Sequence, residues 1–335
     1  MPHAPAAAPA GYGAMPAFGL ASPAALAGAT MGTTWSARLA VPPGITPAMA
    51  EAAIQNALDT VVRQMSTWDD GSDLSRFNRA AAGWQPLPAQ CLYVLRHALE
   101  LACRTDGAYD PTIGPLVNAW GFGPPPYASE PPSADMLRAL MQRVGWQRIT
   151  LDERGGRAWQ PGGACLDLCG IAKGYGVDHA AAALDGLGIS HYLIEVGGEL
   201  RARGSRPDGL PWRIAVEVPD GSEDHVLTLP LFNRSIATSG DYRRYRKAAG
   251  LRYAHTIDPR TGRPLDGGVA SVTVVHGSCM QADALATALS VLGARDGLAY
   301  ARRHQVAALF VLRDGDQLRL QASDAFSSLA GRTAP

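Results

Sequence analysis

The chain has no excess of either charge and few cysteines. Its 335 residues include 30 Lys and Arg and 30 Asp and Glu, so the formal net charge is zero. Proteins that bind nucleic acid through its phosphates normally have a basic excess, so no nucleic acid partner is expected. An odd number of cysteines in a long chain does not indicate a disulfide framework. We expect five buried or inert thiols, at Cys91, Cys103, Cys165, Cys169 and Cys279.

Long apolar runs and export signals are also missing. No segment approaches the roughly 20 apolar residues that a membrane helix needs. The first thirty residues are rich in Ala, Pro and Gly and contain neither Lys nor Arg. They do not match a secretory signal, which begins with positive charge, and no lipobox cysteine is visible. We therefore expect residues 1–29 to be a flexible tail, or what is left of a trimmed signal, and the chain as given to be cytoplasmic.

The common nucleotide-binding and hydrolytic motifs are absent too. The sequence has no Walker loop, no HExxH, no GxSxG and no Rossmann glycine fingerprint. A nucleotide site in this protein must be built in another way.

The composition is that of a soluble globular protein, with 47% hydrophobic and 18% charged residues. Helical periodicity over 47–65 follows a plausible N-cap at Thr46 and a proline at the first helical position. Further helices are expected over 89–104 and 134–144, from about 169 to 186, and from near 281 and near 296. Strands are expected over 31–41, 164–168, 191–196, 199–203, 212–218, 226–231, 234–238, 253–257 and 270–275, with hairpins at 146–160 and around 314–316. Clustered strands flanked by helices predict an α+β fold, with one catalytic domain over residues 30–332.

Asp283 and Thr287 are a candidate metal-binding pair. They are four residues apart in a predicted helix and so lie on one face. Carboxylate and hydroxyl oxygens suit a hard cation such as Mg²⁺. The alternative is that Asp283 is a first-turn acid favoured by the helix dipole and that Thr287 bonds back to its own chain. The spacing alone favours this alternative.

Several other segments could face a nucleotide. The glycine-rich turn at 166–178 could direct backbone N–H groups and Lys173 at a phosphate, and the hydroxyl-rich turn at 238–240 could do the same. Loops that contain Trp68, Trp120 and Phe122 could stack on a flat ring. Ordinary turns and a satellite hydrophobic cluster explain these segments equally well when each is taken alone.

Together, and in this order along the chain, these segments resemble one family. MGTTW, MSTWDDGSDLSRFN, GAYDPTIGPLVNAWGFG, LDLCGIAKGYGVD, SIATSGDYRRY, HTIDPRTGRPL and ADALATAL are similar to motifs of the ApbE-type FAD:protein FMN transferases. The most specific pieces are DPRTG, TSGDY, GIAKGY and ADALAT. The resemblance implies a single T-fold-type domain of mixed sheets flanked by helices, with an active-site cleft between subdomains. It also implies a Mg²⁺-dependent transfer of FMN from FAD to a Ser or Thr hydroxyl of an acceptor protein, with release of AMP.

The resemblance also assigns roles to residues. Asp283, Thr287 and the carbonyl of Gly170 would bind the metal. Residues expected to contact FAD or line its cleft are Met31, Trp68, Ala108, Tyr109, Asp110, Asp167, Lys173, Thr238, Ser239, Gly240, Asp241 and Ile257. Cys169 departs from the family pattern, since a smaller or hydroxyl residue would be expected beside Gly170.

His255 would be the catalytic base, together with the metal carboxylate Asp283. A hydroxyl is a poor nucleophile near neutral pH and needs a base within hydrogen-bond reach. Histidine titrates in the right range, and the Asp258-Pro259 turn would hold it in place.

Two alternatives to transfer are open at this stage: hydrolysis of FAD to FMN and AMP, and binding of FAD without turnover. The family implies an acceptor with a short Ser/Thr flavinylation motif, in a membrane redox complex subunit or a soluble flavoprotein. It also implies a periplasmic or membrane-anchored location, in contrast to the missing signal.

Overall fold

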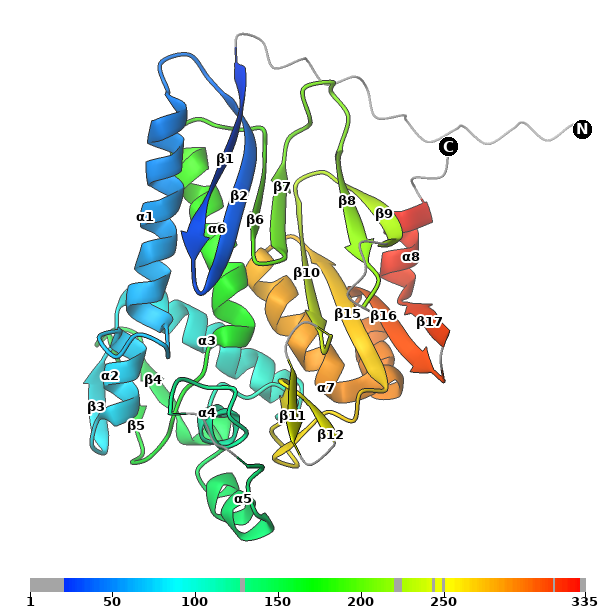
Figure 1. Ribbon diagram of the computed structural model, residues 1–335. Coiled ribbons are helices and arrows are strands. Elements are labelled where there is room, and N and C mark those ends of the chain that lie inside the picture. The colour runs from blue at the N-terminus through cyan, green and yellow to red at the C-terminus, as the bar shows by residue number, and fades with distance from the viewer. Residues whose placement is uncertain are drawn as a thin grey trace, which may run out of the picture.

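The protein is an α+β structure built on one large antiparallel sheet (Figure 1). The computed structural model describes residues 21–126, 130–219, 225–242, 245–248, 251–315 and 317–331. The sheet has eight strands in the order β1-β2-β6-β7-β10-β15-β16-β17. Their bounds are Ser22–Thr30 (β1), Thr33–Val41 (β2), Tyr192–Val196 (β6), Glu199–Arg203 (β7), Arg234–Gly240 (β10), Val269–His276 (β15), Ala307–Asp314 (β16) and Gln317–Ala322 (β17). The predicted fold class is confirmed.

Helices cover one face of this sheet. Trp35 and Leu39 of β2 pack against Ile54 and Leu58 of one helix and Val177 of another. Val272 and Val274 of β15 and Phe310 of β16 pack against a third. The α-helices of the described residues are α1 (Pro47–Met65), α2 (Asp73–Arg79), α3 (Ala89–Arg104), α4 (Gly114–Ala119), α5 (Ala134–Met141), α6 (Cys169–Gly186), α7 (Cys279–Arg303) and α8 (Asp324–Gly331), of which α8 lies on the other face.

A hairpin and a short helix cover part of the opposite face. The hairpin strands β8 (Trp212–Glu217) and β9 (His225–Leu231) bury Trp212, Ile214 and Leu229 against the sheet, and α8 adds Phe326. Smaller sheets complete the structure: β3 (Gly83–Pro86), β4 (Thr150–Asp152) and β5 (Arg157–Gln160); β11 (Tyr245–Ala248) and β12 (Leu251–Ala254); β13 (Ile257–Asp258) and β14 (Arg263–Pro264).

Most predicted helices lie where the periodicity placed them. Thr46 caps α1 by accepting a hydrogen bond from the N–H of Met49, and α3 has the predicted bounds. α5 is shorter than predicted and ends at Met141. The two helices predicted near 281 and 296 are the two parts of α7, which is interrupted at Gly293, where φ is 78°. A positive φ is readily adopted only by glycine, so this residue sets the break.

Two predictions were wrong. Residues 22–29 are not part of a tail, because Ser22–Thr30 form β1; residues 1–20 lie outside the described part. β1 is rich in Ala and has little strand propensity, but it pairs with β2 along its whole length, and Gly28 leaves room for the Trp35 indole. Residues 164–168 form no strand. The backbone of Leu166 bonds to a side chain there and not to a partner strand: the Asn78 amide donates to its carbonyl and accepts from its N–H.

The contact between α6 and α7 depends on Asp178. Its carboxylate accepts hydrogen bonds from the Ser278 hydroxyl at 2.7 Å and from the N–H groups of Cys279 and Met280 at 3.0 Å each. It also forms an ion pair of 2.7 Å with Arg201 of β7. One side chain of α6 therefore caps the first turn of α7 and connects both helices to the sheet.

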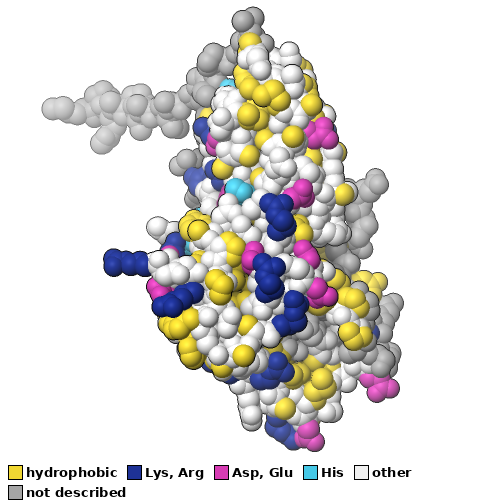
Figure 2. All heavy atoms as spheres, turned by 90° about the vertical axis from the view of Figure 1, so that its left-hand side faces the viewer, with side chains coloured by type: hydrophobic (Ala, Val, Ile, Leu, Met, Phe, Trp, Pro, Cys, Tyr) yellow, Lys and Arg dark blue, Asp and Glu magenta, His cyan; other side chains and the backbone are white. Residues whose placement is uncertain are grey.

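The surface around α1 and α2 carries both charges. Figure 2 shows basic side chains interspersed with acidic ones on this face, and Arg76 and Arg79 pair with Asp73 and Asp70. None of the helices in the described residues is long and apolar enough to cross a membrane.

Two glycines of α6 provide a matched test of the helix contact. A Cβ at Gly174 would lie 2.3 Å from the carbonyl oxygen of Cys279, whereas a Cβ at Gly186 would meet nothing within 4 Å. We expect Gly174→Ala to lower the free energy of unfolding by about 1–3 kcal/mol, because α7 must move away. Gly186→Ala should raise it by up to about 1 kcal/mol, because it restricts the unfolded chain. Urea unfolding followed by circular dichroism measures both, and equal stability of the two variants would contradict the close contact.

Candidate functional site

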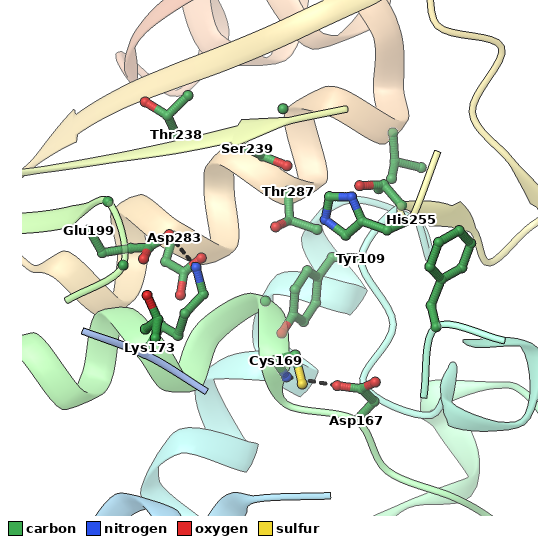
Figure 3. A pocket seen from close by; sticks show the side chains of 18 of the residues that line it. Tyr109, Asp167, Cys169, Lys173, Glu199, Thr238, Ser239, His255, Asp283 and Thr287 are labelled. Carbon is green, nitrogen blue, oxygen red and sulfur yellow. Dashed lines mark hydrogen bonds and ion pairs between the residues drawn. The ribbon is translucent and has the colours of Figure 1, made fainter. Parts of the chain in front are cut away.

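A cavity of about 560 Å³ lies where α6 begins, beside the first turns of α7 and the ends of β7 and β10 (Figure 3). Almost all of the predicted site residues line it, although they come from distant parts of the chain. They are Met31, Trp68, Ala108, Tyr109, Asp110, Asp167, Gly170, Lys173, Thr238, Ser239, Gly240, His255, Ile257, Asp283 and Thr287. Asp241 is the exception.

The start of α6 brings a backbone turn close to α7. The Asp167 carboxylate accepts a hydrogen bond from the N–H of Cys169 at 2.8 Å, which orders the turn. Gly170 has non-helical torsions, with φ −87° and ψ 15°. A Cβ on Gly170 would lie 3.2 Å from Oγ1 of Thr287, so the glycine allows this hydroxyl to approach the backbone.

Asp283 faces the same turn from α7. The N–H of Gly174 donates to Oδ2 of Asp283 at 2.9 Å. Asp283 is 6% exposed, and burial raises its pKa, against the opposing effect of the Lys173 ammonium. The carboxylate is therefore held rigidly between the two helices.

Glu199, which the sequence analysis did not single out, adds a second carboxylate. Its Oε1 accepts a hydrogen bond from Nζ of Lys173 at 2.6 Å. Burial raises the pKa of Glu199 to about 7, although Lys173 lowers it. Burial lowers the pKa of Lys173, but the charges of Glu199 and Asp283 raise it above its ordinary value. The sequence signal that could have found Glu199 is the Gly197-Gly198 turn. Glu199 directly follows this turn and is the first residue of a strand, where it is buried.

The oxygen atoms at this point fit a hard divalent cation. Asp283 contributes a carboxylate, Thr287 a hydroxyl and Gly170 a carbonyl, and all three residues line the cavity. Mg²⁺ and related cations take such oxygen ligands. Within the described residues, no group of three or more His, Cys, Asp or Glu side chains is arranged to hold a metal ion. The metal remains a prediction from the family resemblance, and these three oxygen donors are chemically suited to it.

His255 lies in a break between β12 and β13, not inside the continuous strand predicted over 253–257. Its ring packs edge-on against Phe122, with 6.4 Å between ring centroids. In the following turn the Asp258 carboxylate accepts hydrogen bonds from the N–H and the guanidinium of Arg260, each at 2.9 Å. Arg260 also donates to the carbonyl of Val291 at 3.2 Å. The turn that positions His255 is thus attached to α7, the helix that carries Asp283.

Two predicted contact residues have other partners. The Asp241 carboxylate does not line the cavity, because it forms a bidentate pair with Arg313 at 2.7 and 2.8 Å. Asp110 does line it, but its carboxylate accepts from the hydroxyl of Thr112 at 2.6 Å and from the N–H of Trp146 at 3.0 Å. Both acids fix the chain around the cavity.

The aromatic residues of the candidate stacking loops differ in exposure. Trp120 and Phe122 are buried in a hydrophobic cluster, as the alternative interpretation proposed, whereas Trp68 is 46% exposed.

All five thiols are free. Cys91 and Cys279 are buried, and burial raises the pKa of Cys91 to about 12. Cys103 and Cys169 are exposed, so burial does not extend to all five, and Cys169 lines the cavity.

Comparison with known proteins identifies close relatives. A family model described as the ApbE family matches residues 31–310. A FAD:protein FMN transferase of Vibrio cholerae is 41% identical over 305 residues, which cover 90% of this chain and 91% of the relative. The solved structure of the flavin transferase ApbE from Vibrio cholerae superposes with a TM-score of 0.85 at 40% identity, covering 92% of this chain and 99% of the other. The apo flavinyl transferase ApbE of Pseudomonas stutzeri gives a TM-score of 0.85 at 37% identity, covering 93% and 98%.

Two aspartates test the metal site. Asp283→Asn removes the only carboxylate of the proposed donor set, so we expect Mn²⁺ binding, measured by electron paramagnetic resonance, to weaken by at least about tenfold. Asp241→Asn makes the same chemical change in a residue whose carboxylate is turned to Arg313, and it should leave the affinity unchanged. Equal affinities of the two variants would show that Asp283 is not a ligand.

Proposed function

The chain belongs to the ApbE family, and on that premise we propose that it is a Mg²⁺-dependent FAD:protein FMN transferase. The observation that carries the proposal is the single cavity that places Gly170, Asp283 and Thr287 together with Lys173 and His255. An oxygen donor set, a cation and a base in one cavity are the groups that transfer of a phosphoryl-linked fragment requires.

We propose that FAD is the substrate and occupies this cavity. A volume of about 560 Å³ is typical of a site for a molecule of this kind. Trp68 and Tyr109 offer ring surfaces, and the Lys173 ammonium offers a charge for the pyrophosphate. Ser239 offers a hydroxyl group at the end of β10, whereas the hydroxyl of Thr238 shares a hydrogen bond of 2.9 Å with that of Thr273. The residues from 30 to 332 would act together as one catalytic domain.

The reaction transfers the FMN half of FAD to a hydroxyl group. The acceptor oxygen forms a new bond to the phosphorus of the FMN half, the bond from that phosphorus to the bridging pyrophosphate oxygen breaks, and AMP leaves. A bound Mg²⁺ would neutralise the charge of the pyrophosphate. His255 would take the proton of the hydroxyl, and the Asp258 turn and Phe122 would keep its ring in place. Lys173 would hold the phosphates in line.

The acceptor would be a flavoprotein that presents a Ser or Thr hydroxyl at the cavity mouth. We propose a membrane redox complex subunit or a soluble relative, as the resemblance of the sequence implies. Water in place of this hydroxyl would make the enzyme an FAD pyrophosphatase that produces free FMN and AMP.

The direct test is incubation with FAD, Mg²⁺ and a candidate acceptor domain, with a chelator as the control. We expect AMP by chromatography and, by intact mass, an acceptor heavier by one FMN residue (FMN less one water), and neither product with the chelator. AMP with free FMN and an unmodified acceptor would favour the pyrophosphatase. Intact FAD would contradict both and leave a binding protein.

His255→Ala tests the base. We expect the transfer rate to fall by about 10²–10⁴-fold with little change in FAD binding, because the histidine acts on the acceptor hydroxyl. His304→Ala is the control, since His304 follows α7 and is not among the residues that line the cavity. A His255→Ala enzyme with nearly the wild-type rate would remove this residue from the mechanism.

A further inference from the structure

Glu199 is a buried carboxylate that the proposed reaction does not use. It is the first residue of β7 and is 3% exposed. Its Oε1 accepts the hydrogen bond from Lys173, and its Oε2 is buried without a hydrogen-bond partner among the described residues. Burying an acidic group with one unpartnered oxygen costs free energy, so its position calls for a functional explanation.

The ammonium group of Lys173 lies near two carboxylates, those of Glu199 and Asp283. Figure 3 shows its ammonium between Glu199 and Asp283, with the hydrogen bond made to Glu199. Asp283 uses Oδ2 for the N–H of Gly174. In the part of the chain that the structure describes, Oδ1 of Asp283 accepts no hydrogen bond, so one oxygen of this carboxylate is available.

The net charge of Glu199, Asp283 and Lys173 depends on whether Glu199 is present. Glu199, Asp283 and Lys173 together carry one net negative charge when both acids are ionised, and this charge favours a divalent cation beside them. Without Glu199, Lys173 and Asp283 would be a neutral pair. A lysine ammonium is a compact charge on a flexible stem, so it would move to the remaining carboxylate and compete with the metal for Oδ1.

We propose that Glu199 is a positioning residue that holds the Lys173 ammonium away from Asp283 and thereby keeps Oδ1 of Asp283 available to the metal ion. The inference rests on the metal assignment of the proposed function. It predicts that a residue which is not a ligand sets the metal affinity.

Glu199→Leu tests this role, with Glu195→Leu as the matched control. Both glutamates line the cavity, but Glu195 contacts the Ser36 hydroxyl at 3.3 Å and not Lys173. Mn²⁺ affinity is measured by electron paramagnetic resonance on the full chain, without FAD or acceptor. We expect the dissociation constant to rise by about tenfold or more in Glu199→Leu, and by less than about twofold in Glu195→Leu.

A crystal structure of metal-free Glu199→Leu supplies the second measurement. We expect Nζ of Lys173 within hydrogen-bond distance of Asp283. A lysine that keeps its wild-type position, or equal dissociation constants in the two leucine variants, would overturn the proposal. If Glu199→Leu does not fold, Glu199→Gln replaces it with a weaker acceptor for Lys173, and an intermediate loss of affinity is expected; a wild-type affinity would overturn the proposal.

The outcomes separate this inference from the proposed function. A wild-type protein that binds no Mn²⁺ would overturn both the positioning role and the metal assignment. A wild-type protein that binds Mn²⁺ but leaves FAD intact would reject the transferase, while the comparison of the two leucine variants would still decide the role of Glu199.

Discussion

The site depends on the close contact between α6 and α7, which Asp178 holds at one end. Its carboxylate caps α7 and pairs with Arg201 of β7, so that two helices and a strand are fixed by one side chain. Gly174 then allows the helices to approach until its N–H reaches Asp283. The proposed metal ligands come from both helices, and no ligand geometry would survive their separation.

The packing of α6 against α7 and β7 buries charged side chains. A carboxylate in a buried position ordinarily needs a partner or a metal ion, and the buried carboxylates of Glu199 and Asp283 have one lysine between them. The arrangement is unfavourable for the folded protein alone, and it would favour the proposed binding of a cation together with a pyrophosphate. The low dielectric constant around these buried groups strengthens their electrostatic interactions. The same burial raises the pKa values of Glu199 and Asp283.

The sequence predicted the elements that have strong local signals and missed those held by distant contacts. The helix over Ala89–Arg104 was predicted to the residue, because its apolar period is regular. β1 was missed, since its alanines become a strand only against β2. Nearly all residues that the family resemblance assigned to the site line one cavity. No local pattern showed that Asp241 pairs with Arg313 or that Glu199 bonds to Lys173, because the two partners of each pair are far apart in the sequence.

The separation of the ligands along the chain has a consequence for biosynthesis. Gly174 and Asp283 are 109 residues apart in sequence although they share a hydrogen bond. A nascent chain that has not yet reached α7 contains Lys173 and Glu199 but neither Asp283 nor Thr287. The proposed cation site can therefore form only after most of the domain has been synthesised, so binding at this site would follow the earlier steps of folding and could not guide them.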